Sequence, residues 1–199
     1  MANGTLKVSN IETSSGSGTI TLGQSGETIS VPSGATINLS NATQTGVGGN
    51  LTPAFSVHRG STQTISDATW TKVNFDTEVL DSDGTYDNST NYRFTPASTG
   101  YYLLSCNISL TSTAGTNAMG DNYAAIYKNG TSHVISQNYG NTSNHNTWGQ
   151  HSLSVIVHAD NASDYYEVYA YADMTSGNVE AVGNGTKQYS SFNGFKLIL

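Results

Sequence analysis

The chain has 199 residues, and its formal net charge of −7 comes from 14 acidic and 7 basic side chains. Ser, Thr, Asn and Gly together fill 93 positions, and these residues favour turns and extended strands over helices. The composition therefore excludes a helical bundle. The charges form no basic cluster, so we expect no binding to nucleic acid. No apolar run approaches the roughly 18 residues of a membrane span, so we expect no membrane insertion.

The aromatic residues divide the chain into two regions. All 12 Tyr, 5 Phe and 2 Trp lie at or beyond Phe55. Large rings supply much of the apolar surface of a core, so only the later region has the material for one. The Gly-rich stretch 46–50 is typical of a flexible connection. We therefore predict an N-terminal anchor or stalk at residues 1–50 and a head at residues 51–199.

A weak repeat runs through the first region. Residues 19–22, 28–31 and 36–39 each read as a short strand, at spacings of 9 and 8 residues, and turn-like stretches separate them. Each strand points two aliphatic side chains to one side and Thr, Ser or Asn to the other. A ribbon of this kind is marginal in water by itself. We predict that three copies turn these side chains toward a common axis: Ile20, Leu22, Ile29, Val31, Ile37 and Leu39. A mobile tether, or a strand set that packs on another protein, remains the alternative.

The second region alternates strand and turn signals throughout. Residues 101–110, 151–158 and 165–171 alternate apolar and polar side chains, and Asn129-Gly130 is a strong signal for a tight hairpin. No window carries a convincing helical period. Eight to ten strands over about 145 residues indicate a sandwich of two sheets. The fold class that we predict is therefore all-β.

The order of several local motifs in this region is similar to a known family. They begin with Ala54-Phe55-Ser56-Val57 and continue through Gly100-Tyr101-Tyr102-Leu103 and Ala125-Ile126-Tyr127-Lys128-Asn129-Gly130. They end with Ser191-Phe192-Asn193-Gly194-Phe195. This succession resembles the globular head of complement C1q and its relatives in the tumour-necrosis-factor-like superfamily. The resemblance implies a ten-strand jelly roll that forms homotrimers, with its two termini close together at the base.

The chain departs from the animal members of that family, because it has no collagen-like Gly repeat and no secretory signal at its start. Its N-terminal region resembles segments of virion proteins in tailed phages, particularly marine ones. We therefore predict a structural virion protein: a homotrimeric fibre or spike, displayed on the particle exterior, whose head contacts the host surface. Residues 1–50 would bind other virion proteins of the capsid or tail. The alternative is a capsid decoration protein that stabilises or coats the shell without a receptor role.

Metal and catalytic sites receive little support from the sequence. Asp81, Asp83 and Asp87 surround a Gly in a way that suggests Ca²⁺, but the bidentate Glu expected at the twelfth position of such a loop is replaced by Tyr92. No nucleophile elbow occurs, and no pair of carboxylates can be assigned to one site. We therefore predict no metal, no cofactor and no enzymatic activity. Cys106 lies in an apolar strand and is expected to be a buried, unreactive thiol.

Two long polar stretches, 111–122 and 139–149, are the candidate recognition loops. Amide, hydroxyl and aromatic groups on loops above a rigid sheet are how proteins bind sugars and other surfaces. The candidate contacts with a host glycan or protein are Asn117, Asp121, Asn122, Tyr139, Asn144, His145 and Trp148. Plain solvated loops, or a subunit interface anchored by Trp148, are the alternatives.

Overall fold

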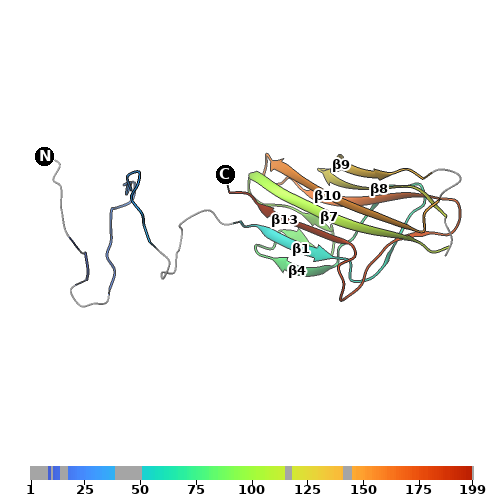
Figure 1. The fold of residues 1–199 in the computed structure, drawn as a ribbon, viewed down its shortest axis with the longest axis horizontal. Helices are drawn as coiled ribbons and strands as arrows, with labels where there is room; N and C mark the ends of the chain where they lie inside the picture. Colours follow the sequence, from blue (N-terminus) through green and yellow to red (C-terminus); the bar gives the residue numbers. More distant parts are fainter. Residues whose placement is uncertain are drawn as a thin grey trace. The chain divides into compact units, whose positions relative to one another are not determined.

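The computed structural model describes residues 9, 11–13, 18–38, 51–114, 118–140 and 145–198. The chain divides into two compact units, Met1–Val47 and Gly48–Leu199. All thirteen strands of the described residues belong to the second unit, the head, and form two sheets (Figure 1). Within the described residues, no helix has the length and apolarity that a membrane crossing would need.

Sheet A has seven strands, and its central strand is β7 (Gly100–Ser112). Along one edge, β7 pairs with β10 (Trp148–Ala159) over twelve residues, from Gly100↔Ala159 to Thr111↔Trp148. Along most of both strands, core-facing apolar side chains alternate with outward-facing ones, as expected of strands that are buried on one side. On the other edge of β7 lie β13 (Ser191–Lys196), β1 (Ala54–His58), β4 (Thr77–Asp81), β12 (Val179–Ala181) and β2 (Gln63–Ile65).

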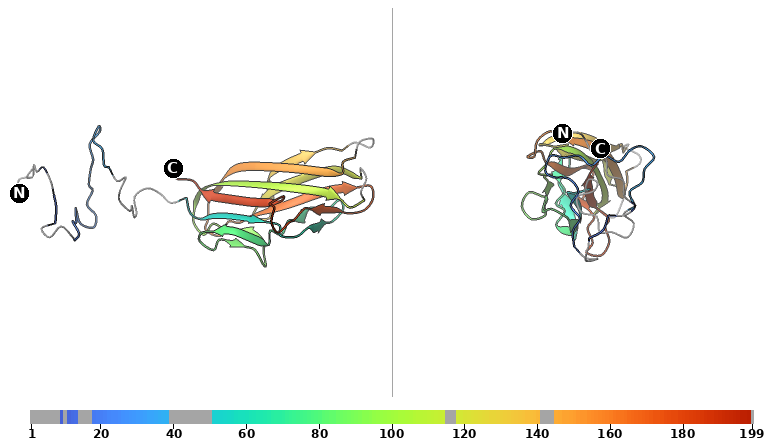
Figure 2. Two further views of the ribbon diagram at one scale, coloured as in Figure 1. Left: turned by 60° about the horizontal axis from the view of Figure 1, so that its bottom comes forward. Right: turned by 90° about the vertical axis from the view of Figure 1, so that its left-hand side faces the viewer.

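Sheet B has six strands and covers the other side of the core (Figure 2). Its centre is the pair β11 (Tyr166–Met174) and β8 (Met119–Lys128), and β9 (Thr131–Asn138) continues it beyond β8. Short strands complete the other edge: β3 (Thr71–Lys72), β5 (Tyr86–Asp87) and β6 (Arg93–Phe94). The described residues thus form thirteen strands rather than ten, because five of them are only two or three residues long. The all-β jelly-roll sandwich is as predicted.

The core between the sheets is built from aromatic rings at one end and smaller side chains at the other. The ring of Phe55 lies 4.4 Å from that of Phe94 and 4.9 Å from that of Phe192, measured between centroids. The sulfur of Cys106 is buried in the same core, and burial raises the pKa of its thiol to about 12. The prediction of a buried, unreactive thiol is therefore consistent with the structure.

The predicted hairpin at Asn129-Gly130 is confirmed, and a second glycine, Gly194, is needed for the packing of the core. Asn129 and Gly130 have φ angles of 52° and 77°, the two positive values that a type I′ hairpin turn requires. Gly194 lies between strands β1 and β7, where an added Cβ would come within 2.6 Å of Leu104 Cδ2 and 2.7 Å of Phe55 Cε1. The absence of a side chain at residue 194 is what allows the core to close.

Candidate assembly and recognition surfaces

The described part of the N-terminal repeat is exposed in the single chain. Residues 18–38 contain two hydrogen-bonded turns, in which Glu27 N donates to Gln24 O and Ala35 N donates to Pro32 O. Gly26 and Gly34 have φ angles of 87° and 84° at the third position of these turns, as type II turns require. Within the described residues 18–38, the segments between these turns form no β-ladder.

The aliphatic side chains of this repeat face solvent. Ile20 and Val31 are each 42 % exposed, and Leu22, Ile29 and Ile37 are about 60 % exposed. Leu39 lies outside the described residues. Burying such side chains is favourable by roughly 1.5–3 kcal/mol each. Packing the repeat against another apolar surface would therefore be strongly favourable. That these side chains meet at a three-fold axis remains a prediction, because the single chain shows only that they are exposed.

Within the head, the chain begins and ends at the same end of the sandwich. Ala54 pairs with Phe195, and Lys196 N donates to Pro53 O at 3.1 Å (Figure 1). Trp148 pairs with Thr111 near the far end of β7. At about 3.3 Å per residue, Thr111 lies roughly 30 Å along the strand from Tyr102, the partner of Lys196. The described residues 113–114, 118, 139–140 and 145–147 are therefore at the end of the head opposite Pro53.

The structure separates the predicted recognition residues. Asp121 and Tyr139 come together around Tyr123: the Tyr123 hydroxyl donates to Asp121 Oδ2 at 2.8 Å, and the Tyr139 ring lies 5.7 Å from the Tyr123 ring. Trp148 is 59 % exposed but belongs to sheet A. His145 is half-buried in the loop before β10. Asn117 and Asn144 lie outside the described residues.

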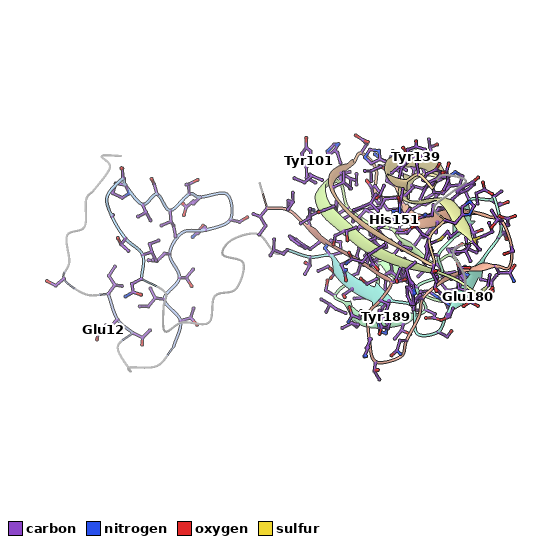
Figure 3. The ribbon with its side chains drawn as sticks, turned by 45° about the vertical axis from the view of Figure 1, so that its right-hand side comes forward. Glu12, Tyr101, Tyr139, His151, Glu180 and Tyr189 are labelled. Atoms are coloured by element: carbon purple, nitrogen blue, oxygen red, sulfur yellow. The ribbon has the colours of Figure 1, made fainter. Side chains whose placement is uncertain are left out.

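Asn122 corrects one of these predictions. It belongs to strand β8 and is wholly buried, so it does not reach the surface. Its Nδ2 donates to Gly120 O at 2.9 Å, and its Oδ1 lies 2.9 Å from His151 Nε2. His151 Nδ1 lies 3.0 Å from Ser136 Oγ, and burial lowers the pKa of the imidazole. Asn122 therefore ties a buried, neutral histidine between the sheets (Figure 3 labels His151).

The acidic loop that suggested Ca²⁺ uses its carboxylates to hold its own backbone. Asp81 Oδ1 accepts from Thr85 N at 3.0 Å, and Oδ2 accepts from Tyr86 N at 2.8 Å. The Asp87 carboxylate accepts three backbone N–H groups, at residues 89–91, which hold its pKa well below the usual range. Among the described residues, no group of three or more His, Cys, Asp or Glu side chains is arranged to hold a metal ion. The carboxylates of Asp81 and Asp87 therefore stabilise the backbone of their own loops.

The outer face of sheet A carries no Asp, Glu, Lys or Arg on the four neighbouring strands β1, β13, β7 and β10, and Glu180 of β12, the partner of Thr111, lies beside them. Cross-strand pairs in the register of β1, β13, β7 and β10 identify the side chains that point away from the core. None of them is Asp, Glu, Lys or Arg. Large apolar groups stand among small polar ones, with Tyr101 44 %, Ile156 60 % and Trp148 59 % exposed. We call this the uncharged face: residues 54, 56, 58, 101, 103, 105, 107, 109, 111, 148, 150, 152, 154, 156, 158, 191, 193 and 195.

Polar side chains on the uncharged face pair with each other across strands. Ser56 Oγ donates to Asn193 Oδ1 at 2.6 Å, and Ser152 Oγ donates to Asn107 Oδ1 at 2.6 Å. Their hydrogen-bonding capacity is thus partly met within the sheet. Both ring nitrogens of His58, a buried member of this face, have no hydrogen-bond partner. A surface that lacks formal charges and pairs part of its polar groups internally loses little hydration energy when it is buried, which favours its use at the centre of a protein interface.

Sheet B presents a very different outer face, which sequence reasoning missed. Tyr123 pairs with Tyr171 in the β8–β11 register, and their rings stack at 5.2 Å. Tyr127 and Tyr169 meet at 4.2 Å further along the same two strands. The Trp70 ring lies within 6.0 Å of the rings of Tyr123, Tyr127 and Tyr171. We call these five half-buried rings the aromatic face: Trp70, Tyr123, Tyr127, Tyr169 and Tyr171.

The signal for the aromatic face was present in the sequence. The four tyrosines occupy alternate positions of two predicted strands, at 123 and 127 and at 169 and 171, so each pair necessarily points to one side. No local sequence pattern indicates that these two strands are neighbours or that Trp70 packs against them. The β8–β11 pairing spans more than forty residues, and Lys72, two residues after Trp70, pairs with Tyr169.

Carboxylates surround the aromatic face. Asp173, Asp121 and Asp67 all act on the Tyr171 hydroxyl, and with burial they raise its pKa. At the other end, the Lys72 ammonium lies 2.5 Å from Glu167 Oε1 and 6.0 Å from the centroid of the Tyr169 ring. Burial, together with the nearby Asp121 or Glu167 carboxylate, raises the pKa of Tyr123 and of Tyr169 to about 12. Both hydroxyls already donate to these carboxylates, Tyr123 to Asp121 Oδ2 and Tyr169 to Glu167 Oε2.

Comparison with known proteins places the fold of the head. No protein-family model matches the chain, and no curated protein matches its sequence. Among solved structures, the globular domain of zebrafish complement 1qA protein is 16 % identical, with a TM-score of 0.51, covering 73 % of this chain and 97 % of that one. Eiger TNF from S. frugiperda is 12 % identical (TM-score 0.54, 72 % and 91 % covered), and murine APRIL is 13 % identical (TM-score 0.50, 72 % and 98 % covered).

Identities this low show the fold alone. The head is a jelly roll of the C1q and TNF type, as the order of its motifs suggested. The complement protein and the TNF proteins share this architecture with the chain, while its assembly and its role must be argued from its own surfaces.

Proposed function

We propose that this chain is a homotrimeric fibre or spike protein of a tailed-phage virion. Residues 1–50 attach it to capsid or tail proteins and form a stalk. The head is displayed on the particle exterior and contacts the surface of the host cell, through a glycan or a protein. The function is structural and adhesive, with no cofactor and no catalytic step.

The uncharged face carries the proposal. Of the 14 acidic and 7 basic residues of the chain, none takes an outward position on β1, β13, β7 or β10, whereas Asp121, Glu167 and Asp173 lie on the central strands of sheet B. Charges are depleted at the centres of protein interfaces because they are costly to desolvate. Exposed Tyr101, Ile156 and Trp148 supply the apolar anchors that such an interface needs. Association of copies through this face buries these anchors.

The N-terminal repeat supports the same assembly. Its aliphatic side chains are exposed in one chain, and identical chains brought together by their heads would present identical apolar edges to each other. Three heads on one particle bind jointly, so weak individual contacts suffice to hold it on a cell.

Molecular mass in solution tests the assembly. We expect the purified chain to sediment near three times 21.0 kDa. Ile156→Lys puts a charge on the uncharged face and should give monomers with unchanged circular dichroism. Ile135→Lys is the matched control, because Ile135 is 42 % exposed on sheet B and its replacement should leave the trimer intact. A wild-type monomer at micromolar concentration contradicts the proposal.

Particle reconstruction tests the location. Density for the head at the tail supports adhesion, whereas density at three-fold or quasi-three-fold positions of the capsid favours shell decoration. A chain without residues 1–50 should still fold and form trimers, yet fail to join particles. Incorporation of the truncated chain would show that the attachment segment is elsewhere.

A further inference from the structure

The aromatic face has an unusual chemical make-up for an exposed sheet. Its five rings touch one another in a continuous layer over β3, β8 and β11. Four of the five are tyrosines, which combine a flat apolar body with a polar tip. A partner that matches this surface must offer flat apolar patches and hydroxyl or amide groups at the same time.

A pyranose ring has this combination. Its C–H bonds gather on one or both faces of the ring, and carry the slight positive charge that the negative face of an aromatic ring attracts. Its hydroxyls point outward from the ring edge and need hydrogen-bond partners. Polar groups border the aromatic face where such partners are required: Asp121 beside Tyr123, Gln137 hydrogen-bonded to Tyr139, and the Lys72–Glu167 pair beside Tyr169.

The charges of the border select among possible ligands. Asp121 and Asp173 lie two residues from Tyr123 and Tyr171 on β8 and β11, and so point to the same side of sheet B. At the other end, Glu167 pairs with the Lys72 ammonium beside the Tyr169 ring. Arg93 is engaged further along, over the Tyr165 ring. This net negative border repels sulfated or phosphorylated glycans and nucleic acid. It also opposes a second copy of the same face, because the carboxylates of the two copies would meet.

We propose that the aromatic face is a binding platform for neutral pyranose chains. The sugar rings stack on Trp70 and on the Tyr123–Tyr171 pair, and their hydroxyls bond to Asp121 and to tyrosine hydroxyls. This inference rests on the proposed adhesive role and names the class of host molecule that is recognised. It also moves the recognition site: of the loop residues predicted from the sequence, it keeps Asp121 and Tyr139 and leaves out Trp148.

Fluorescence of Trp70 provides a direct test. Trp70 and Trp148 are the two tryptophans of the chain, so Trp148→Phe leaves Trp70 as the sole reporter. The full-length Trp148→Phe protein is titrated with neutral hexasaccharides of β-1,4-linked glucose, β-1,4-linked N-acetylglucosamine and α-1,4-linked glucose, and with heparin as the anionic comparison. We expect at least one neutral hexasaccharide to change Trp70 emission saturably and to protect it from acrylamide. Heparin should do neither.

Variants then show whether the rings themselves bind. Tyr123→Ala and Tyr171→Ala, measured by calorimetry, should each weaken binding about tenfold, as the loss of one stacked ring predicts. Tyr171→Phe keeps the ring and should stay close to wild type. Tyr189→Ala is the control, because Tyr189 is 42 % exposed and lies well away from Tyr139 in the head (Figure 3).

Three results overturn the inference: a folded protein that binds none of the neutral hexasaccharides, even if it captures a host protein; tighter binding of heparin; or unchanged affinity in both alanine variants. Sedimentation and particle incorporation are measured on the same proteins. A chain that forms trimers and joins particles but binds no sugar refutes the platform alone, whereas a monomer that binds sugar refutes the proposed assembly alone.

Discussion

Gly194→Ala tests how tightly the core closes around strand β13. An added Cβ would lie 2.6 Å from Leu104 Cδ2, 2.7 Å from Phe55 Cε1 and 3.1 Å from Leu103 O. The neighbouring strands β1 and β7 hold residue 194 from both sides, so the methyl group has no free direction. Inserting a methyl group into a packed core costs typically 1–3 kcal/mol. Because two core atoms and a carbonyl are involved, we expect about 3 kcal/mol.

Thermal unfolding measures this cost. For a domain of this size, about 3 kcal/mol corresponds to a fall in Tm of roughly 6–12 °C, followed by near-UV circular dichroism at one fixed protein concentration, since assembly makes Tm depend on concentration. Gly185→Ala is the matched control. Apart from the two neighbouring residues in the chain, the atom nearest to an added Cβ at residue 185 is Gly60 O at 4.0 Å. The Tm of this variant should therefore match that of the wild type.

A compensating substitution separates the clash from other causes. Leu104→Val removes the Cδ2 atom that the new methyl group would strike. If the clash is the cause, the double variant should be more stable than the sum of the two single effects predicts. A Gly194→Ala protein with wild-type Tm, or strictly additive effects in the double variant, would refute the reasoning.

Three further predictions follow from buried or hydrogen-bonded groups. Burial lowers the pKa of His151, so below about pH 6.5 the unfolded chain takes up a proton that the native state resists. As the pH is lowered, the free energy of unfolding should therefore fall by at most about 1.4 kcal/mol per pH unit. Urea titrations of His151→Gln should show a shallower fall. Burial raises the pKa of the Cys106 thiol to about 12, so a thiol reagent should modify it only in unfolded protein, and equal rates in native and urea-treated samples would contradict this. Backbone hydrogen bonds hold the pKa of Asp87 below its usual range, so the stability that its ionised form contributes is present above about pH 4 and lost in stronger acid; Asp87→Asn should be less stable than wild type at neutral pH, with a difference that disappears in acid.

Local chemistry explains why much of the head could be predicted. Positive φ at Asn129 and Gly130 is available to few residues, so that dipeptide indicates a hairpin wherever it falls between strands. Alternation in residues 101–110 and 151–158 indicates strands that are buried on one side, and these became the long pair β7 and β10. The predicted division between the N-terminal segment and the head rests on the positions of the aromatic residues, which can be read directly from the sequence.

Asn122 shows where reading a loop from composition failed. Its polar neighbours Asp121 and Asn117 suggested a solvated loop, yet strand β8 begins at Met119. Alternation from Tyr123 would have turned residue 122 inward, but a polar side chain is affordable there only because His151, from a strand nearly thirty residues away, meets its amide. Partners at that separation are not visible in a local pattern.

The sequence by itself determined the all-β class, the strands and turns of the head, the order of motifs that resembles C1q, and the apolar repeat of residues 19–39. Each of these follows from backbone preferences and from the two-residue period of a strand. Only the tertiary structure decided that Trp70 and the tyrosines of β8 and β11 form one layer, and that the outward side of four strands in sheet A is free of charge. A surface is defined by which strands pair, and this pairing joins residues from about 40 to about 140 positions apart, through contacts that no short stretch of sequence contains.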